Sequence, residues 1–189
     1  DLKIIKYTVS ENDLLLEVPL IPPDAVATVI KIEVKGDPEI SDIMTIMEEY
    51  PASLDAYAAN RSGNANYSQT RWTEEFGDWK YASFIDGWKD QGDVVYWRFK
   101  ITEPGFYRVL LDYSFTDAKG SSEGLIQMDG QELYFEALKT GDERHHFRDH
   151  QIGVVNVETA GIKELSINPV STDNTGEFIQ LQRVKLIPL

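Results

Sequence analysis

The sequence predicts an all-β fold in which short antiparallel strands form a sandwich. The clearest signal is a strict apolar/polar alternation in two neighbouring segments, 95–101 and 107–113. Similar short runs, bounded by Gly, Pro, Asn and Asp, recur along the chain after residue 50. Helical periodicity is almost absent. Many short strands with regular turn signals are typical of a sandwich.

Composition bounds the size and the partners of this domain. The chain has 189 residues, 42% of them hydrophobic, which suits one good-sized domain or one domain with an additional piece. The formal net charge of −14 disfavours binding to nucleic acid and to anionic membranes, so we expect neither partner. The absence of cysteine excludes disulfides and cysteine-ligated zinc.

The first 38 residues are predicted to form a β prelude. Three alternating runs lie in residues 2–6, 14–18 and 26–34, separated by turn-type residues. Three strands cannot bury a face alone, so we expect the prelude to be a remnant of a preceding β-domain, cut from a longer protein. Residues 39–51 are predicted as a connector with a short helix over Ser41–Tyr50, in which Ser41 or Asp42 is the N-cap.

The sandwich is predicted to cover residues 52–189. Its first strand is expected at Ala52–Asn60, followed by a polar exposed loop at Arg61–Thr70. The segment 71–93 is rich in aromatic residues without clean periodicity, which predicts loops and a short strand.

The two central segments are predicted to form a hairpin that turns at Glu103–Gly105, because Pro104 removes a backbone donor and Gly105 permits the reversal. Trp97 is expected in the core. A second hairpin is predicted at the tight turn Asp129–Gly130. The last strands are expected at 152–157, 162–167 and 177–187.

The central segment resembles galactose-binding-like carbohydrate-binding modules of the family 6 and 35 type. The pattern W-x-F-x-I-x-x-P-G-x-Y-x-V-x-L-x-Y runs from Trp97 to Tyr113, and similar motifs follow at Met128–Leu133, Ala160–Pro169 and Glu177–Pro188. The resemblance covers roughly residues 52–189. It implies a jelly-roll sandwich that binds glycans through its loops.

The prelude adds a second resemblance. Leu14–Gly36, LLLEVPLIPPDAVATVIKIEVKG, is similar to the end of the β-domain that follows the barrel in glycoside hydrolase family 29 α-L-fucosidases. The two pieces together resemble the C-terminal accessory region of such an enzyme. This implies an upstream catalytic domain in the same chain, and a secreted or periplasmic bacterial protein.

Aromatic and polar residues in the loops predict a sugar site. Aromatic faces stack on the apolar faces of sugars, while Asp, Asn and Arg bond their hydroxyls. In the resembling modules, ligands bind at loops on one edge of the sandwich. The predicted carbohydrate-binding residues are Trp72, Trp79, Tyr81, Asp86, Trp88, Asp90, Arg71 and Asn174. The alternative is that these tryptophans fill the ends of the sandwich or an interface with the prelude.

A structural calcium ion is a further possibility that the resemblance implies. The usual pattern has a carboxylate in the first strand, which Asp55 matches only partly, with Glu177 near the last strand. His145, His146 and His150 lack the helix that an i, i+4 metal pair needs, so no histidine site is predicted. No carboxylate pair stands in a motif that marks a glycosidase, and no catalytic residue is predicted.

Two functions remain open on the sequence. The first is a non-catalytic carbohydrate-binding module that keeps a glycoside hydrolase near its glycan. The alternative is a structural accessory domain that packs on a fucosidase-like barrel and binds no sugar. An independent enzyme is not expected.

Overall fold

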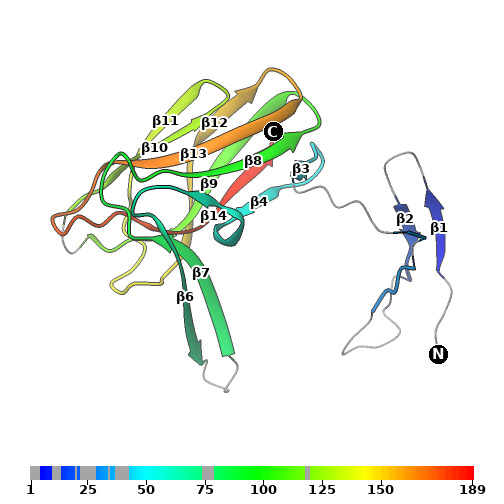
Figure 1. The fold of residues 1–189 in the computed structure, drawn as a ribbon, viewed down its shortest axis with the longest axis horizontal. Coiled ribbons are helices and arrows are strands. Elements are labelled where there is room, and N and C mark those ends of the chain that lie inside the picture. The colour runs from blue at the N-terminus through cyan, green and yellow to red at the C-terminus, as the bar shows by residue number, and fades with distance from the viewer. Residues whose placement is uncertain are drawn as a thin grey trace. The chain divides into compact units, whose positions relative to one another are not determined.

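The chain forms two compact units, Asp1–Ile40 and Ser41–Leu189. The computed structural model describes residues 5–9, 14–19, 21, 29–33, 35–36, 43–73, 79–117 and 120–189. The second unit is a sandwich of two six-stranded sheets (Figure 1). The predicted all-β class is therefore confirmed. In the part of the chain described, no helix has the length and apolar character needed to span a bilayer.

The first unit contains one antiparallel hairpin among its described residues. Strands β1 (Lys6–Val9) and β2 (Leu14–Glu17) pair from Lys6↔Glu17 to Val9↔Leu14. The predicted third strand is not seen where it can be checked, because residues 29–33 are described and form no strand. Residues 22–28 and 34 lie outside the described residues.

The first sheet of the sandwich, which we name the β8 sheet, has the order β11-β10-β13-β8-β3, and β5 also pairs with β8. All its pairs are antiparallel except β3 with β8. Its strands are β3 (Met44–Ile46), β5 (Asn60–Arg61), β8 (Val95–Ile101), β10 (Glu123–Met128), β11 (Gln131–Glu136) and β13 (Gly161–Ser171).

The second sheet, the β9 sheet, has the order β12-β9-β14-β7-β6, and β4 also pairs with β14. All its pairs are antiparallel. Its strands are β4 (Ala52–Asp55), β6 (Asn66–Thr73), β7 (Trp79–Asp86), β9 (Gly105–Ser114), β12 (Arg148–Val157) and β14 (Gln180–Pro188).

The two central strands belong to different sheets, so the hairpin predicted at Glu103–Gly105 is wrong. The chain crosses there from β8 in one sheet to β9 in the other, and the Tyr107 hydroxyl donates to the Glu103 carbonyl at 3.0 Å. The alternation itself was interpreted correctly. The inward residues of both strands pack in the core and are at most 2% exposed: Val95, Trp97, Phe99, Ile101, Tyr107, Val109, Leu111 and Tyr113.

The connector contributes a strand to the sandwich, and the helix predicted over residues 41–50 is wrong. Met44–Ile46 forms β3, parallel to β8, and the Ile46 side chain is 1% exposed. The Ile46 carbonyl accepts hydrogen bonds from the backbone N–H of Thr102 at 3.1 Å and from its hydroxyl at 3.2 Å. Pairing and burial therefore override a weak helical pattern. The expected N-caps, Ser41 and Asp42, lie outside the described residues.

The aromatic-rich segment forms a long hairpin rather than loops. Strands β6 and β7 pair along their full length, from Asn66↔Asp86 to Thr73↔Trp79, so the predicted loop at Arg61–Thr70 ends where β6 begins. β7 meets β14 at one position, Leu181↔Ile85. Figure 1 shows the rest of the hairpin extending beyond the other strands.

Two local predictions can be compared directly with the strands. The expected strand 52–60 is interrupted by a single 3-10 turn, η1 (Ala56–Ala58), between β4 and β5. The tight turn at Asp129–Gly130 is confirmed, because Met128 pairs with Gln131 and both turn residues have positive φ, 51° and 76°. Two successive positive φ angles suit the right-handed twist of a hairpin.

Candidate functional site

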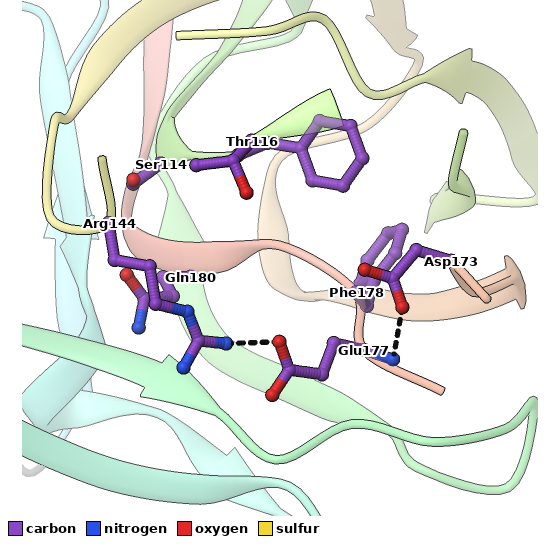
Figure 2. A pocket seen from close by; sticks show the side chains of 8 residues that line it. Ser114, Thr116, Arg144, Asp173, Glu177, Phe178 and Gln180 are labelled. Carbon is purple, nitrogen blue, oxygen red and sulfur yellow. Dashed lines mark hydrogen bonds and ion pairs between the residues drawn. The ribbon is translucent and has the colours of Figure 1, made fainter. Parts of the chain in front are cut away.

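A polar pocket lies at one end of the sandwich, where β9 ends and β14 begins. Figure 2 shows that its side chains come from the end of β9 and from two loops, 137–147 and 172–179. The pocket is small and open to solvent, with a cavity volume of about 20 Å³. We name this the loop-end pocket; it is lined by Ser114, Phe115, Thr116, Arg144, Asp173, Glu177, Phe178 and Gln180.

The 172–179 loop is held by the side chain of Asp173. Its Oδ1 atom accepts hydrogen bonds from the Thr175 N–H at 2.8 Å, the Thr175 hydroxyl at 2.7 Å and the Glu177 N–H at 3.0 Å. The Asp173 carbonyl also accepts from the Gly176 N–H at 2.9 Å. An aspartate that bonds backbone groups two residues on is a standard way to fix a turn. The backbone of Glu177 is therefore held in a defined position.

The 137–147 loop is anchored to β9 and β14. The N–H of the buried Thr140 donates to the Phe115 carbonyl at 2.9 Å, and the Thr140 hydroxyl accepts from the Phe115 N–H at 2.9 Å. The His145 N–H donates to Gln180 Oε1 at 3.2 Å, and the His146 N–H donates to Ser114 Oγ at 3.1 Å. These bonds place Arg144 at the mouth of the pocket.

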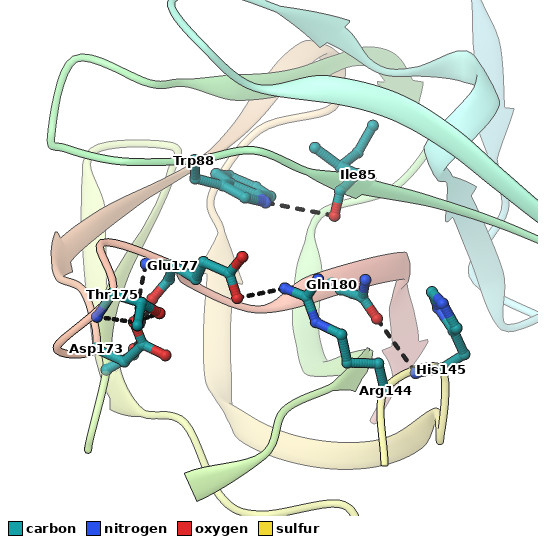
Figure 3. Close-up of polar contacts among 9 residues, drawn as sticks. Ile85, Trp88, Arg144, His145, Asp173, Thr175, Glu177 and Gln180 are labelled. Carbon is teal, nitrogen blue, oxygen red and sulfur yellow. Dashed lines mark hydrogen bonds and ion pairs between the residues drawn. The ribbon is translucent and has the colours of Figure 1, made fainter. Parts of the chain in front are cut away.

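An ion pair joins the two loops across the pocket. Arg144 Nη2 donates to Glu177 Oε2, and both side chains are about half exposed (Figures 2 and 3). A pair this exposed adds at most about 1 kcal/mol to folding stability. Its position matters more, because it presents a guanidinium and a carboxylate at the surface of one pocket.

His145 adopts an unusual backbone conformation beside the pocket. Its φ is +68°, and its exposed ring lies 5.0 Å from the Phe84 ring and 6.4 Å from the Phe147 ring. Burial against these rings lowers the pKa of His145, and the Arg144 charge lowers it further, while Asp86 and Gln180 oppose the shift. The imidazole is therefore neutral at pH 7. A non-glycine residue with positive φ is often found at functional positions.

Trp88 is a core residue, which corrects the expectation of an exposed stacking platform. It is 1% exposed, its indole N–H donates to the Ile85 carbonyl at 3.4 Å, and its ring meets Phe178 edge-on at 5.5 Å. Figure 3 shows this ring with its N–H directed at the Ile85 carbonyl. Trp88 therefore supports Phe178 in the wall of the pocket instead of contacting solvent.

The loop that carries Trp88 is organised by a buried aspartate. Asp93 is 1% exposed and accepts from the N–H groups of Asn64 (2.5 Å), Lys89 (2.5 Å) and Asp90 (3.2 Å), and from the Asn64 amide at 3.1 Å. Desolvation alone would raise its pKa, but these donors outweigh it and lower the pKa of Asp93. Gly63 has a φ of +68°, and a Cβ there would lie 2.1 Å from Asp93 Oδ1, so glycine is required.

The other predicted sugar-binding residues occupy three places. Asp86, at the end of β7, accepts from the Ser68 hydroxyl at 2.9 Å and acts electrostatically on His145, the neighbour of Arg144 in the chain. Asn174 is exposed in the 172–179 loop, next to Gly120. Asp90 is exposed and caps its own loop by accepting from the Gly92 N–H at 2.8 Å. The remaining predicted residues lie on the β6–β7 hairpin: Arg71, Trp72, Trp79 and Tyr81.

The two predicted calcium ligands contact different cations. Asp55 Oδ1 accepts from the Ser53 hydroxyl at 3.0 Å and lies 3.7 Å from Arg183 Nε, whereas Glu177 pairs with Arg144. Within the described ranges, no group of three or more His, Asp or Glu side chains is placed to hold a metal ion. Asp55 and Glu177 thus each lie beside an arginine, and a calcium ion held by these two residues stays a prediction.

Sequence reasoning missed several residues of the pocket. Arg144 stands in no recognisable motif, and nothing in the motif Glu177–Pro188 marks Gln180 as a site residue. Only the folded chain brings the two together. Asp173 did carry a signal, because Thr172–Gly176 reads T-D-N-T-G, a composition typical of an aspartate-fixed turn. The sequence analysis used that loop only for Asn174.

Comparisons with known proteins identify the fold. No protein-family model and no curated protein matches the sequence. Among solved structures, a family 35 carbohydrate-binding module from Clostridium thermocellum matches with a TM-score of 0.58 and 14% identity, over 74% of this chain and 99% of that one. The Cry4Aa toxin from Bacillus thuringiensis matches with a TM-score of 0.58 and 15% identity, over 79% of this chain and 25% of the toxin.

An isomalto-dextranase from Arthrobacter globiformis T6, solved with panose, matches with a TM-score of 0.50 and 17% identity, over 72% of this chain and 23% of the enzyme. At such identities the likeness concerns the fold and not the function. This chain thus has the β-sandwich fold of a family 35 carbohydrate-binding module, a fold that is also found within larger proteins of other kinds.

Proposed function

We propose that the sandwich is a non-catalytic carbohydrate-binding module that binds a glycan at the loop-end pocket. The observation that carries this proposal is the pocket itself, in which polar side chains from two loops and two strands converge. The likeness of the fold to a family 35 carbohydrate-binding module supports it.

The side chains of the pocket suit the hydroxyl groups of a sugar. Glu177 and Asp173 offer carboxylate acceptors, Arg144 offers donors, and Ser114 and Thr116 offer hydroxyls. The rings of Phe115 and Phe178, both buried, form the apolar base of the pocket. Polar groups that converge over an apolar base are typical of small-molecule sites.

Some of the residues predicted from the sequence remain part of this proposal. Asp86 and Asn174 flank the pocket and extend its polar surface. Asp90 belongs to the loop that carries Trp88, the residue that supports Phe178 in the pocket. On the β6–β7 hairpin, Arg71, Trp72, Trp79 and Tyr81 are proposed as an aromatic extension for longer glycans.

We further propose that this domain serves a secreted glycoside hydrolase of which it is a part. The resemblance of Leu14–Gly36 to the β-domain of α-L-fucosidases motivates the assignment. The acidic surface, with a net charge of −14, supports a role away from nucleic acid and anionic membranes.

The test is a glycan-array screen of the purified chain with and without calcium, followed by titration calorimetry on each hit. The double variant Arg144→Ala/Glu177→Ala removes both charges together and so leaves no unpaired charge. We expect it to weaken binding at least about tenfold, about 1.4 kcal/mol, with the unfolding transition unchanged.

The matched control is Lys139→Ala. Lys139 lies on the same loop and pairs with Asp117 at 3.2 Å and Asp142 at 2.8 Å, but it does not line the pocket. The Lys139→Ala variant should bind each glycan with the same affinity as the parent protein. Equal affinity in the double variant, or no binding to any glycan at millimolar concentration, would contradict the proposal.

A structural accessory domain is the second candidate, and one observation favours it. Phe106, Val154 and Leu189 are 57%, 40% and 63% exposed, and the Leu189 N–H donates to the Phe106 carbonyl at 3.0 Å. Val154 lies on the neighbouring strand, opposite Arg108. Large apolar residues exposed side by side are typical of a surface that another domain covers. A blank glycan array would favour this candidate.

A further inference from the structure

A second cavity lies at the opposite end of the sandwich from the loop-end pocket. Its volume is about 450 Å³, which suits a small organic molecule, whereas that of the loop-end pocket is about 20 Å³. It lies where β12 ends: Val157 in that strand pairs with Gly105 at the start of β9, while Ser114 at the end of β9 lines the loop-end pocket. We name it the turn-end pocket; it is lined by Asp129, Gly130, Gln131, Asn156, Glu158 and Thr159.

One side chain of the turn-end pocket bridges the two sheets. Gln131 begins β11, the edge strand of the β8 sheet, and Asn156 lies on β12, the edge strand of the β9 sheet. Gln131 Nε2 donates to the Asn156 carbonyl at 2.6 Å, and Gln131 Oε1 accepts from the Asn156 N–H at 2.9 Å. These bonds hold the wall of the pocket in place before a ligand binds, which lowers the entropy lost on binding. They use only backbone atoms of Asn156 and leave its side-chain amide for the ligand.

A nearly buried lysine joins the two turns that border the pocket. Lys163 on β13 is on the same side of the strand as Leu165 and Ile167, which are fully buried, so it points inward. Its side chain is 9% exposed, and its Nζ donates to Asp129 Oδ1 at 2.7 Å and to Thr159 Oγ1 at 3.3 Å. A buried ammonium group needs such partners. The charge of Asp129 is therefore matched within the protein.

Glu158 supplies the charge of the pocket that remains unmatched. The lining contains two carboxylates, Asp129 and Glu158, and Lys163 pairs with the first. Among the residues that the structure describes, neither the Glu158 carboxylate nor the Asn156 side-chain amide has a hydrogen bond or ion pair. A carboxylate binds a cationic donor more strongly than a neutral one. The pocket thus offers a partner for one positive charge, with the amide and the Thr159 hydroxyl for neighbouring polar groups.

We propose that the turn-end pocket binds a sugar that carries a primary ammonium group, the chemistry of an amino sugar. The ammonium group pairs with Glu158, and the sugar hydroxyls bond to Asn156 and Thr159. Every side chain of the lining is polar, so the pocket suits a hydroxylated amine better than an aliphatic one. In the loop-end pocket, by contrast, Arg144 and Glu177 already pair with each other. This inference goes beyond the proposed function and does not depend on it.

The test compares three β-1,4-linked disaccharides, those of glucosamine, N-acetylglucosamine and glucose. They differ only at C2, which carries an ammonium, an acetamide or a hydroxyl group. Titration calorimetry uses the full chain in a mildly acidic buffer that keeps the amine protonated. We expect the glucosamine disaccharide to bind at least about tenfold more tightly than the other two. Equal affinity for all three, or no binding of the amine, would overturn the inference.

Two variants test the residues of the turn-end pocket. Glu158→Gln keeps the shape of an exposed side chain and removes its charge, so it should weaken binding of the amine at least about tenfold. Asn156→Ala keeps the backbone bonds to Gln131 and should weaken binding about threefold to tenfold. Thermal unfolding checks that both variants fold. Unchanged affinity in Glu158→Gln would overturn the inference.

The matched control for charge is Glu164→Gln. Glu164 is exposed on β13 opposite Arg98 and does not line the pocket, so its loss changes the net charge equally. The affinity for the amine should stay unchanged. An equal loss of affinity in Glu164→Gln and Glu158→Gln would show that the amine is drawn only to the acidic surface as a whole, and this would overturn the site.

A second control separates the turn-end pocket from the loop-end pocket. Arg144→Ala/Glu177→Ala should keep full affinity for the glucosamine disaccharide. If this variant loses the affinity while Glu158→Gln keeps it, the amine binds at the loop-end pocket. In that case the inference is overturned and the proposed function stands.

Discussion

The pKa values of two buried aspartates, Asp93 and Asp112, are shifted in opposite directions in this sandwich. Asp93 lies among backbone N–H donors, and its pKa is lowered. Asp112 is 9% exposed, and desolvation together with the Asp149 charge raises its pKa against the pull of Arg183. Arg183 Nε, although 3.3 Å from Asp112, makes no hydrogen bond. Hydrogen-bond geometry, rather than proximity to a cation, decides which carboxylate is stabilised as an anion.

Asp93→Asn should destabilise the sandwich by about 3 kcal/mol at pH 7. The amide of the variant points an N–H group at backbone donors, which leaves buried N–H groups without an acceptor. The folded-state pKa of Asp93 lies below its unfolded value. The stability it contributes is therefore fully present above the unfolded pKa and is lost as the pH falls through the folded pKa.

Urea unfolding of the parent and the variant at several pH values tests this expectation. The difference in unfolding free energy should be constant near neutral pH and should shrink in acid. Asp90→Asn is the control, because Asp90 is exposed and its side chain accepts one bond, from Gly92. The unfolding free energy of Asp90→Asn should be lower than that of the parent by less than about 1 kcal/mol. If the difference in unfolding free energy between the parent and Asp93→Asn grew as the pH falls, the stabilising role of the Asp93 carboxylate would be contradicted.

At the residue scale, local sequence pattern did not predict which side chains meet at the loop-end pocket. Trp88 was expected at the surface because it stands among Gly and charged residues, but Asp93 folds that loop back and buries the ring. Arg144 and Glu177 are 33 residues apart; Arg144 belongs to no motif, and Glu177, which opens the motif Glu177–Pro188, was predicted as a calcium ligand. Their pairing depends on long-range contacts that local pattern does not record.

At the scale of strands, alternation predicted which residues are buried but not which strands pair. The inward positions of β8 and β9 are all in the core, yet the two strands belong to opposite sheets. A turn with Pro and Gly permits both a hairpin and a crossing between layers, so sequence alone does not distinguish them. β3 was missed because three residues are too few to establish a period.

Gly124 is a point where packing between elements fixes the sequence. A Cβ at this position in β10 would lie 2.4 Å from Phe135 and 2.6 Å from Phe178. Both rings would have to move, and Phe178 lines the loop-end pocket. Gly124→Ala should therefore destabilise the sandwich by about 1–3 kcal/mol through overpacking. It should also change any sugar affinity measured at that pocket.

Denaturant unfolding combined with titration calorimetry measures both effects. Gly105→Ala is a matched control, since the nearest atom to its new Cβ would be 3.9 Å away, an ordinary contact. We expect Gly105→Ala to leave the unfolding free energy nearly unchanged. Equal stability of the two variants would mean that the rings near Gly124 have room to adjust.

At the scale of the whole chain, the core belongs to the second unit. The core cluster runs from Ile46 to Leu186, and in the first unit the described residues form one two-stranded hairpin. A hairpin of two strands is marginally stable on its own in water. We therefore expect the boundary that matters for folding to lie near Ser41, ahead of β3, and not at Ala52, the predicted start of the sandwich.

Two truncations test this boundary. A chain of residues 41–189 should unfold cooperatively, with a free energy within about 1 kcal/mol of the full chain, because it keeps β3 and the whole core cluster. A chain of residues 52–189 lacks β3. It loses the buried Ile46 side chain and leaves both Thr102 donors without their acceptor, so it should be less stable by about 3–5 kcal/mol.

Denaturant unfolding of the three chains in one buffer measures the differences in unfolding free energy. Equal stability of the two truncations would show that residues 41–51 are a passive connector, and a large loss in the longer one would show that residues 1–40 contribute to the fold of the sandwich.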